Sequence, residues 1–188
     1  MRQDDLYALP PGLPVPTDDG ACDHLTGLAV PPIALPSTQG GTVRLDQPST
    51  RWTVVYAYPR TGQPTVDSPP GWDQIPGARG CTPQNCGYRD HYQELQALGA
   101  EVYGLSTQTT EYQKEMADRL HLPYPVLSDA ALELTTALRL PTFHYGDWTL
   151  LRRFSLVLRD GRIAKVFYPV FPSNADSGWV TEWVGTQR

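Results

Sequence analysis

The segment Trp52 to Tyr58 (WTVVYAY) decides the fold of this chain. It is an apolar run of β-branched and aromatic residues, which predicts a core strand. The next regular segment, Pro83–Leu98, has apolar side chains at helical spacing and is followed by Gly99, a residue type that commonly ends helices. This helical stripe consists of Tyr88, Tyr92, Leu95 and Leu98. The core is therefore expected to begin with a strand followed by a helix.

Strands and helices continue to alternate toward the C-terminus. Further strands are predicted at Glu101–Leu105, Phe154–Leu158 and Ile163–Tyr168. Asp160-Gly161 is a turn signal that joins the last two strands as a hairpin. Further helices are predicted at about 110–120, at about 129–138 and from Asp176 onward. Asp176 is expected to cap this last helix, whose inner face would carry Trp179, Val180 and Trp183.

A short hairpin is expected before the first core strand. Ile33–Leu35 and Thr42–Leu45 flank Gly40-Gly41, which favours a turn. Parallel strands that are joined by helices and closed by an antiparallel hairpin form a mixed sheet with helices on both faces. The predicted fold class is therefore α/β, with a mixed central sheet and a leading N-terminal β hairpin.

Length and composition indicate one folded domain. The 188 residues are 40 % hydrophobic, which suffices for one substantial core. We assign residues 1–28 to an N-terminal arm and residues 29–188 to the domain. The formal net charge of -5 argues against a nucleic-acid partner, which requires a basic face. Residues 1–16 have no apolar run of the kind found in signal peptides or membrane spans, so a cytoplasmic location and no membrane partner are expected.

The cysteines indicate redox chemistry. Permanent disulfides are rare in a reducing cytosol, so the closely spaced Cys81 and Cys86 are interpreted as a redox-active or metal-binding pair. The third cysteine, Cys22, lies among Asp18, Asp19 and Asp23, whose negative charges raise the pKa of its thiol. Cys22 is therefore expected to be unreactive.

Cys81 lies where a loop leads into the first long helix. Thr82 is expected to be the N-cap, and Pro83 fits the first turn, where a missing N–H does no harm. Unpaired backbone N–H groups and the positive end of the helix dipole then favour the thiolate of Cys81. Arg79, and an arginine from elsewhere in the fold, are expected to add to this effect and to stabilise charge on a peroxide oxygen. Attack of the thiolate on an O–O bond gives a sulfenic acid, which a second thiol must resolve.

Cys86 is the candidate for this second thiol. On an ideal helix the two Cα atoms are about 8.5 Å apart, whereas a disulfide requires less than about 7 Å. A Cys81–Cys86 disulfide therefore requires the start of the helix to unwind, which Pro83 and Gly87 make easier. A disulfide formed in this way is readily reduced by an external dithiol.

The segment Gly80 to Asp90 (GCTPQNCGYRD) resembles the cysteine helix of the peroxiredoxins, specifically of the PrxQ or bacterioferritin-comigratory-protein type. The resemblance runs from about Ala29 to the C-terminus and implies a thioredoxin-like fold. Its other parts are Tyr58-Pro59, Gly104-Leu105-Ser106 and Pro125–Asp129. Arg153 resembles the family arginine that contacts both the cysteine and the peroxide, and Arg152 is its rival by one residue.

The resemblance implies a thioredoxin-dependent thiol peroxidase. Cys81 would reduce hydrogen peroxide or an organic hydroperoxide, Cys86 would form the transient disulfide, and a thioredoxin-like reductant would recycle it. Arg153 would contact the peroxide, Pro59 would shield Cys81, and Gly80 would belong to the pocket. No cofactor and no metal is expected, and a monomer suffices because both cysteines lie in one chain.

One part of the sequence departs from the family pattern. The family motif has Thr or Ser three residues before the cysteine, whereas this chain has Ala78, and Thr61 to Gly80 is an insertion relative to the motif. Either Thr61 supplies the missing hydroxyl, or backbone N–H groups near Gly80 and Cys81 bind the peroxide alone. The insertion is either a surface loop anchored by Trp72 or a segment that covers the Cys81 pocket or contacts the reductant.

Three other interpretations compete with a peroxidase. In the first interpretation, the two cysteines are simply buried small apolar residues. Zinc is the second, with Cys81, Cys86 and His91 as ligands and Cys22 and His24 to complete them, although residues spaced by five do not share one helix face. The third is a thioredoxin-fold redox sensor or binding module whose disulfide signals to a partner.

Overall fold

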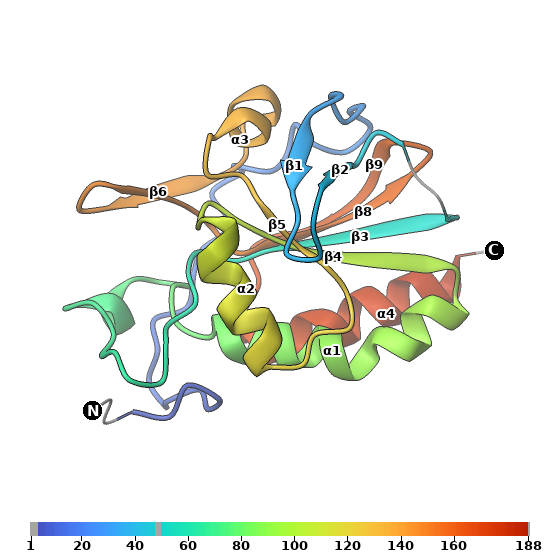
Figure 1. Ribbon diagram of the computed structural model, residues 1–188. Coiled ribbons are helices and arrows are strands. Elements are labelled where there is room, and N and C mark those ends of the chain that lie inside the picture. Colours follow the sequence, from blue (N-terminus) through green and yellow to red (C-terminus); the bar gives the residue numbers. More distant parts are fainter. Residues whose placement is uncertain (1–3, 48–49, 188) are drawn as a thin grey trace.

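A five-stranded mixed sheet lies at the centre of the fold, with the strand order β5-β4-β3-β8-β9 (Figure 1). The computed structural model describes residues 4–47 and 50–187. The sheet comprises β3 (Trp52–Ala57), β4 (Ala100–Ser106), β5 (Val126–Ser128), β8 (Phe154–Arg159) and β9 (Arg162–Phe167). β3, β4 and β5 run parallel, and β8 pairs antiparallel with both β3 and β9. The predicted α/β class with a mixed central sheet is confirmed.

The central strand β3 is buried along its whole length. Its side chains alternate between two separate core layers, as the period of two in a strand requires. Trp52, Val54 and Tyr56 pack into one layer, and Val55 and Ala57 pack into the other. An apolar run without polar alternation is therefore the pattern of a strand covered on both faces.

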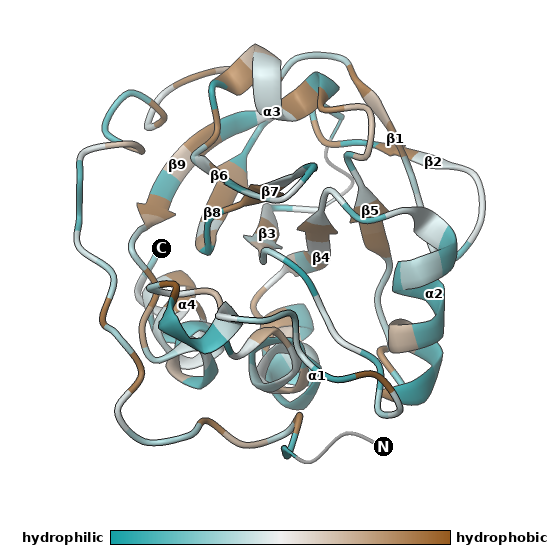
Figure 2. Cartoon of the chain, turned by 90° about the vertical axis from the view of Figure 1, so that its left-hand side faces the viewer, coloured by the Kyte–Doolittle hydropathy of each residue, from teal (hydrophilic) through white to brown (hydrophobic). Residues whose placement is uncertain are grey.

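Helices cover both faces of the sheet (Figure 2). The helices α1 (Cys81–Ala97), α2 (Thr110–Arg119) and α4 (Asp176–Thr186) contribute Leu95, Met116 and Val180 to the core layer on one face. On the opposite face, α3 (Glu133–Leu138) contributes Leu134 and Leu138. The predicted placement of helices on both faces is confirmed.

Two hairpins flank the sheet. The leading hairpin was predicted and consists of β1 (Ala34–Pro36) and β2 (Thr42–Arg44), paired antiparallel. A second hairpin, β6 (Thr142–Tyr145) with β7 (Trp148–Leu151), was not predicted, and neither was β5. β5 is only three residues long, and β6 has no fully buried residue, so neither has the long apolar run by which the other strands are recognised. Short 3₁₀ turns lie at Trp72–Gln74 and Ser173–Ala175.

Two predicted helix caps were wrong. α1 begins at Cys81 rather than after Thr82, and the residue before it is Gly80, whose φ of 110° ends the loop without a side-chain cap. Asp176 is the first residue of α4, but its carboxylate bonds to side chains of α1 and β8 instead of capping its own helix. Trp179, expected on the inner face of α4, is 37 % exposed, whereas Val180 is buried.

The third helix also begins later than predicted. Asp129 lies outside α3, which starts at Glu133. The buried carboxylate of Asp129 accepts hydrogen bonds from the backbone N–H groups of Leu134 (3.1 Å) and Thr135 (2.8 Å). Asp129 therefore lies before the helix and accepts hydrogen bonds from N–H groups of its first turn, instead of forming part of that turn.

The N-terminal arm is packed against the domain. Leu25 is fully buried in one core layer, and the backbone N–H of Gly27 donates to the carbonyl of Ile163 at 2.7 Å. The beginning of the arm lies near the start of α1, where Leu9 approaches Gly80 (Figures 1 and 2). Residues 4–28 thus connect the edge strand β9 with the loop that precedes Cys81.

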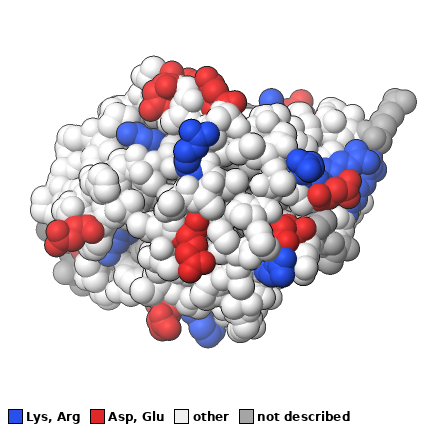
Figure 3. Space-filling view, turned by 90° about the horizontal axis from the view of Figure 1, so that it is seen from above, with Lys and Arg blue, Asp and Glu red and all other residues white. Residues whose placement is uncertain are grey.

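Acidic and basic side chains are interspersed on the face seen from above in Figure 3, where they form no continuous basic area among the described residues. No helix in residues 4–47 and 50–187 is both long and apolar enough to cross a membrane.

Candidate active site

Cys81 is the first residue of α1, and its side chain is only 4 % exposed. The first backbone N–H groups of a helix have no intrahelical partner, so the thiol lies at the positive end of the helix dipole. The residue before Cys81 must be a glycine, because Ser173 and Leu9 pack closely against Gly80. A Cβ at this position would overlap the hydroxyl oxygen of Ser173 and lie 2.7 Å from a methyl carbon of Leu9. The hydroxyl of Ser173 donates to the carbonyl of Gly80 at 2.7 Å. The loop that presents Cys81 is therefore closely packed.

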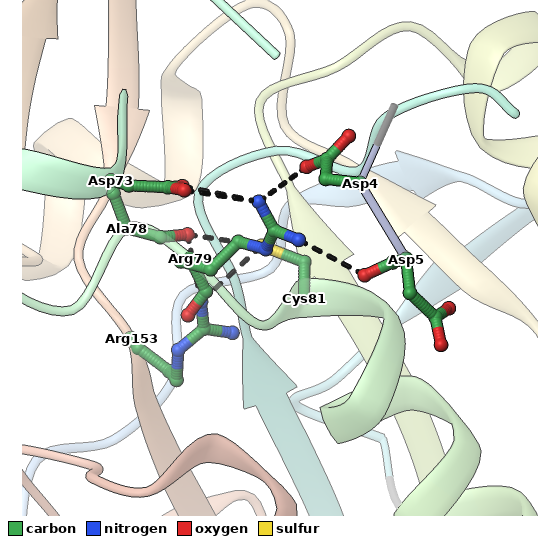
Figure 4. Close-up of polar contacts among 7 residues, drawn as sticks. All are labelled: Asp4, Asp5, Asp73, Ala78, Arg79, Cys81 and Arg153. Carbon is green, nitrogen blue, oxygen red and sulfur yellow. Dashed lines mark hydrogen bonds and ion pairs between the residues drawn. The ribbon is translucent and has the colours of Figure 1, made fainter. Parts of the chain in front are cut away.

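Arg153 lies against the sulfur (Figure 4). This residue immediately precedes β8, and its Nη2 atom is 3.3 Å from Sγ of Cys81. The same nitrogen donates to the carbonyls of Gly77 and Ala78, each at 3.1 Å, and of Arg79 at 3.3 Å. The rival Arg152 instead lies over the ring of Phe143, 5.8 Å from its centroid. The structure therefore brings Arg153, and not Arg152, to the cysteine.

A buried polar network holds Arg153 in place. Its Nη1 atom donates to Oε1 of Gln84 at 2.6 Å, and Nε2 of Gln84 donates to the carboxylate of Asp176 at 2.8 Å. The same carboxylate oxygen accepts from the hydroxyls of Tyr88 (3.0 Å) and Ser155 (2.6 Å). The network joins α1, β8 and α4. A buried cation needs such polar partners, because its desolvation is otherwise costly.

Sequence reasoning missed Gln84 and Asp176. Gln84 follows Cys81 by three residues, so both lie on one face of α1, and this spacing was an available signal. Asp176 had no such signal, because an acidic residue at the start of a helix is normally explained as a cap. Its partners come from elements distant in the sequence.

A cavity of about 40 Å³ adjoins Cys81. Thr61, Gly80 and Thr82 line it together with the cysteine, so the structure brings two of the predicted pocket residues to the site. Thr61 is buried, and the amide of Gln108 fixes it: Oε1 of Gln108 accepts from the backbone N–H (3.0 Å) and the hydroxyl (3.3 Å) of Thr61. Pro59 is buried after the end of β3 and is not among the residues that line the cavity.

Among the described residues, Arg79 makes no hydrogen bond to Sγ of Cys81, and the expectation that its charge favours the thiolate stays a prediction. In the described residues its guanidinium bonds instead to the carboxylates of Asp4 (2.6 Å) and Asp73 (3.2 Å) and to the carbonyl of Asp5 (2.9 Å) (Figure 4). Three nearby hydrogen-bond acceptors hold this cation at the edge of the cavity that Cys81 also lines.

The sequence pattern of the redoxin family matches residues 25–180. This chain belongs to the redoxin family. Peroxiredoxin bcp1 of Schizosaccharomyces pombe is 36 % identical over 130 residues, which cover 68 % of this chain and 59 % of that protein. The chloroplastic peroxiredoxin Q of Sedum lineare is 31 % identical over 142 residues, or 76 % of this chain and 67 % of that protein. The chain thus spans about three fifths of the length of the first relative, and the predicted resemblance to the PrxQ and bacterioferritin-comigratory type is confirmed.

Solved structures of the same type share the fold of this redoxin. Peroxidoxin BcpB of Mycobacterium tuberculosis superposes with a TM-score of 0.72 at 24 % identity, over 88 % of this chain and 99 % of that one. Peroxiredoxin Q of Xanthomonas campestris superposes with a TM-score of 0.68 at 20 % identity, over 87 % of this chain and 97 % of that one. These likenesses confirm the thioredoxin-like peroxiredoxin fold.

Cys86 of this redoxin is half-buried on α1, and all three cysteines are free. Burial raises the pKa of the Cys86 thiol, and Asp90 raises it further, whereas Arg89 lowers it. Between the two cysteines, buried Asn85 accepts from the hydroxyl of Tyr56 at 2.6 Å. Unwinding of this segment must therefore break a buried hydrogen bond.

Cys22 lies away from this site, in the core layer that α3 covers. Burial, with smaller effects from Asp18, Asp19 and Asp23, raises the pKa of Cys22 to about 12. Among residues 4–47 and 50–187, no three His, Cys, Asp or Glu side chains are grouped so that they could hold a metal ion. His91 instead has its Nδ1 atom 3.0 Å from the carbonyl of Gly87.

Asp176 predicts a characteristic pH dependence of stability. Burial raises the pKa of Asp176, against the lowering effect of its hydrogen bonds to Ser155, Gln84 and Tyr88. A carboxyl group with a raised folded-state pKa adds stability below its unfolded pKa of about 3.9, and this contribution is lost as the pH rises through the folded-state pKa. The free energy of unfolding of the wild type, relative to Asp176→Asn, should therefore decrease as the pH rises above about 4.

Urea unfolding followed by circular dichroism at several pH values between about 3.5 and 7 measures this difference. Asp46→Asn is a control of opposite sign, because the hydrogen bond from Arg44 lowers the pKa of Asp46. The prediction would be contradicted if the free energy of unfolding of the wild type, relative to that of Asp176→Asn, increased with pH.

Proposed function

We propose that this chain is a thiol peroxidase that reduces hydrogen peroxide and organic hydroperoxides with Cys81. One observation carries the proposal, namely that Nη2 of buried Arg153 lies 3.3 Å from the sulfur at the start of α1. A guanidinium and a helix N-terminus both stabilise negative charge, first on the thiolate and then on the departing oxygen. The peroxiredoxin relatives support the same chemistry.

In the first step, the thiolate of Cys81 attacks the terminal oxygen of the hydroperoxide. An S–O bond forms and the O–O bond breaks, so that Cys81 becomes a sulfenic acid and the peroxide is reduced to an alcohol or to water. The leaving oxygen takes up a proton as it departs. We propose that Arg153, whose Nη2 atom touches the sulfur, also stabilises the negative charge on that oxygen, and one of its donors, Nε, has no partner among the described residues.

In the second step, the thiol of Cys86 attacks the sulfenic acid, and water leaves as the disulfide forms. Both residues belong to α1, so the segment from Cys81 to Cys86 must unwind, because its helical Cα separation of about 8.5 Å exceeds the disulfide range. A thioredoxin-like dithiol then reduces the disulfide by thiol exchange. Because one chain carries both cysteines, we propose that the protein acts as a monomer. We further propose a cytoplasmic location, with residues 1–28 as an arm and 29–188 as the domain.

Thr61 is the proposed replacement for the hydroxyl that Ala78 lacks. Both Thr61 and Cys81 line the same cavity, whereas Ala78 is buried beneath Trp72 in a small apolar cluster. We further propose that Gly80 allows the backbone to approach the peroxide and that Pro59 excludes water from the end of β3. No cofactor or metal takes part in these steps.

The cysteine roles are tested by treating the reduced protein with one equivalent of hydrogen peroxide and measuring masses of intact and digested protein. The wild type should lose two thiols and form the Cys81–Cys86 disulfide. Cys86→Ser should stop at a Cys81 sulfenic acid, and Cys81→Ser should not react. Cys22→Ser is the matched control and should behave like the wild type. Slow oxidation of the wild type with both thiols present would reject the peroxidase and leave the redox sensor.

Arg153 should matter for the rate of Cys81 oxidation far more than its neighbour does. Arg153→Lys removes the planar donor pair and should lower the second-order rate constant with hydrogen peroxide about 10²-fold. Arg152→Lys is the matched control, since that side chain faces Phe143, and should change the rate constant less than about twofold. Stopped-flow measurements on samples with equal thermal stability make the comparison, and equal losses in both variants would argue against the proposal.

Thr61→Val should lower the same rate constant about tenfold, the effect of losing one hydrogen bond of roughly 1.4 kcal/mol. Thr61→Ser keeps the hydroxyl and should retain most of the rate. If Thr61→Val reacts like the wild type, backbone N–H groups near Gly80 and Cys81 bind the peroxide without it.

A further inference from the structure

We propose that the N-terminal arm and the inserted loop form a roof over Cys81 that selects small hydroperoxides. Arg79 bonds to both parts of this roof and holds them together, and its set of bonds is called the clasp below. The roof is defined here as residues 4–9 and 61–72. This inference rests on the proposed peroxidase function and narrows its substrate class to hydrogen peroxide and other hydroperoxides with little bulk. It also assigns a specificity-determining role to a residue that does not contact the sulfur.

The clasp joins three separate segments. Arg79 precedes Cys81 by two residues, and its side chain is only 7 % exposed. Its Nη1 atom binds the carboxylate of Asp4 in the arm at 2.6 Å and that of Asp73, which directly follows residues 61–72 of the insertion, at 3.2 Å. Its Nη2 atom donates to the backbone carbonyl of Asp5 at 2.9 Å (Figure 4). A planar guanidinium can satisfy several acceptors at once, which suits it to hold the arm and the loop together.

Both parts of the roof are also attached by apolar packing. In the arm, Leu9 lies so close to Gly80 that an added Cβ would be 2.7 Å from its methyl carbon. In the loop, buried Trp72 packs with Ala78 and with Leu150 of β7. The hydroxyl of Tyr145 in β6 donates to the carbonyl of Pro70 at 2.7 Å. The roof is therefore fixed at its far end by the β6–β7 hairpin and at its near end by Arg79.

The roof leaves little space above the sulfur. Leu6 of the arm and Val66 of the loop line the Cys81 cavity, as does Arg79, and the cavity volume is about 40 Å³. A single buried water needs about 10–15 Å³ on this measure, whereas a cavity that holds benzene is roughly 150 Å³. The two oxygen atoms of hydrogen peroxide therefore fit in the cavity beneath the roof. The phenyl group of cumene hydroperoxide is larger than this cavity, so we expect the roof to hinder its entry.

Another part of the cavity wall is formed by residues outside the roof. Arg60 and Tyr112 line both this cavity and a neighbouring cleft of about 370 Å³. The guanidinium of Arg60 lies over the ring of Trp148, 3.8 Å from its centroid, and 5.5 Å from that of Tyr112. This wall offers a rival place for the size barrier, and the experiment separates the two.

The experiment measures the rate constants for oxidation of Cys81 by hydrogen peroxide and by cumene hydroperoxide in a Cys86→Ser background, where no disulfide step follows. The roof variants are Asp4→Asn with Asp73→Asn, which weaken the clasp from the side away from Cys81, and Leu6→Ala, which removes part of the roof. Asp46→Asn is the matched control, because Asp46 forms an equally short ion pair with Arg44 at 2.6 Å outside the cavity lining. Arg60→Ala tests the rival wall.

The wild-type roof should make oxidation by hydrogen peroxide at least about tenfold faster than oxidation by cumene hydroperoxide. The Asp4→Asn/Asp73→Asn variant and Leu6→Ala should each raise the cumene hydroperoxide rate about fivefold or more, a change of about 1 kcal/mol, and leave the hydrogen peroxide rate within about twofold. High salt should act in the same direction on the wild type, because screening weakens partly exposed ion pairs. Asp46→Asn should change neither rate.

Two results would overturn the roof. One is a wild type that reacts equally fast with both peroxides, and the other is a ratio of rates that changes in Arg60→Ala but not in the roof variants. A protein that does not react with hydrogen peroxide at all would instead reject the peroxidase function. The two failures are therefore distinguishable.

Discussion

The contact between Arg153 and Cys81 is the constraint on which the rest of the site depends. Nη2 of Arg153 is held by three backbone carbonyls of the loop before α1 and reaches the sulfur at 3.3 Å. This geometry exists only because β8 pairs antiparallel beside β3, which places the residue before β8 under the loop that enters α1. A buried guanidinium without such acceptors would be strongly destabilising. The loop and the arginine therefore fix one another.

The residues behind Arg153 explain how Arg153 and Asp176 can both be buried. Gln84 links Arg153 to Asp176 through its amide, so that the cation and the carboxylate interact without direct contact. Because Tyr88 and Ser155 share the same carboxylate oxygen, α1, β8 and α4 are tied at one point. Gln84 lies between Cys81 and Cys86, so the unwinding proposed for disulfide formation would also break its bonds to Arg153 and Asp176. Tyr88 and Ser155 lie outside that segment, and their bonds to Asp176 can keep α1, β8 and α4 together while it opens.

The departure from the family pattern at Ala78 has a structural counterpart. Trp72 packs against Ala78 at one end of the insertion, and Thr61 lines the Cys81 cavity from the other end. The sequence predicted the insertion and left its two roles open. Trp72 anchors the insertion, and residues of the insertion line the cavity next to Cys81, which supports the proposed roof. Which residues of the N-terminal arm join this cover was not predictable, since Leu6 carries no local signal.

The sequence by itself determined the features that depend on local pattern. The buried strand at Trp52–Ala57, the helix that begins near Cys81 and the alternation of strands and helices follow from residue spacing, and the resemblance of Gly80 to Asp90 to a known cysteine helix indicated the chemistry. Only the tertiary structure decided the destinations of charged side chains. Arg79 turned to the N-terminal arm and Asp176 to a buried network, because each bonds to partners distant in the chain. Hydrogen-bond acceptors brought together by folding, and not neighbours in sequence, determine where a buried charge is stable.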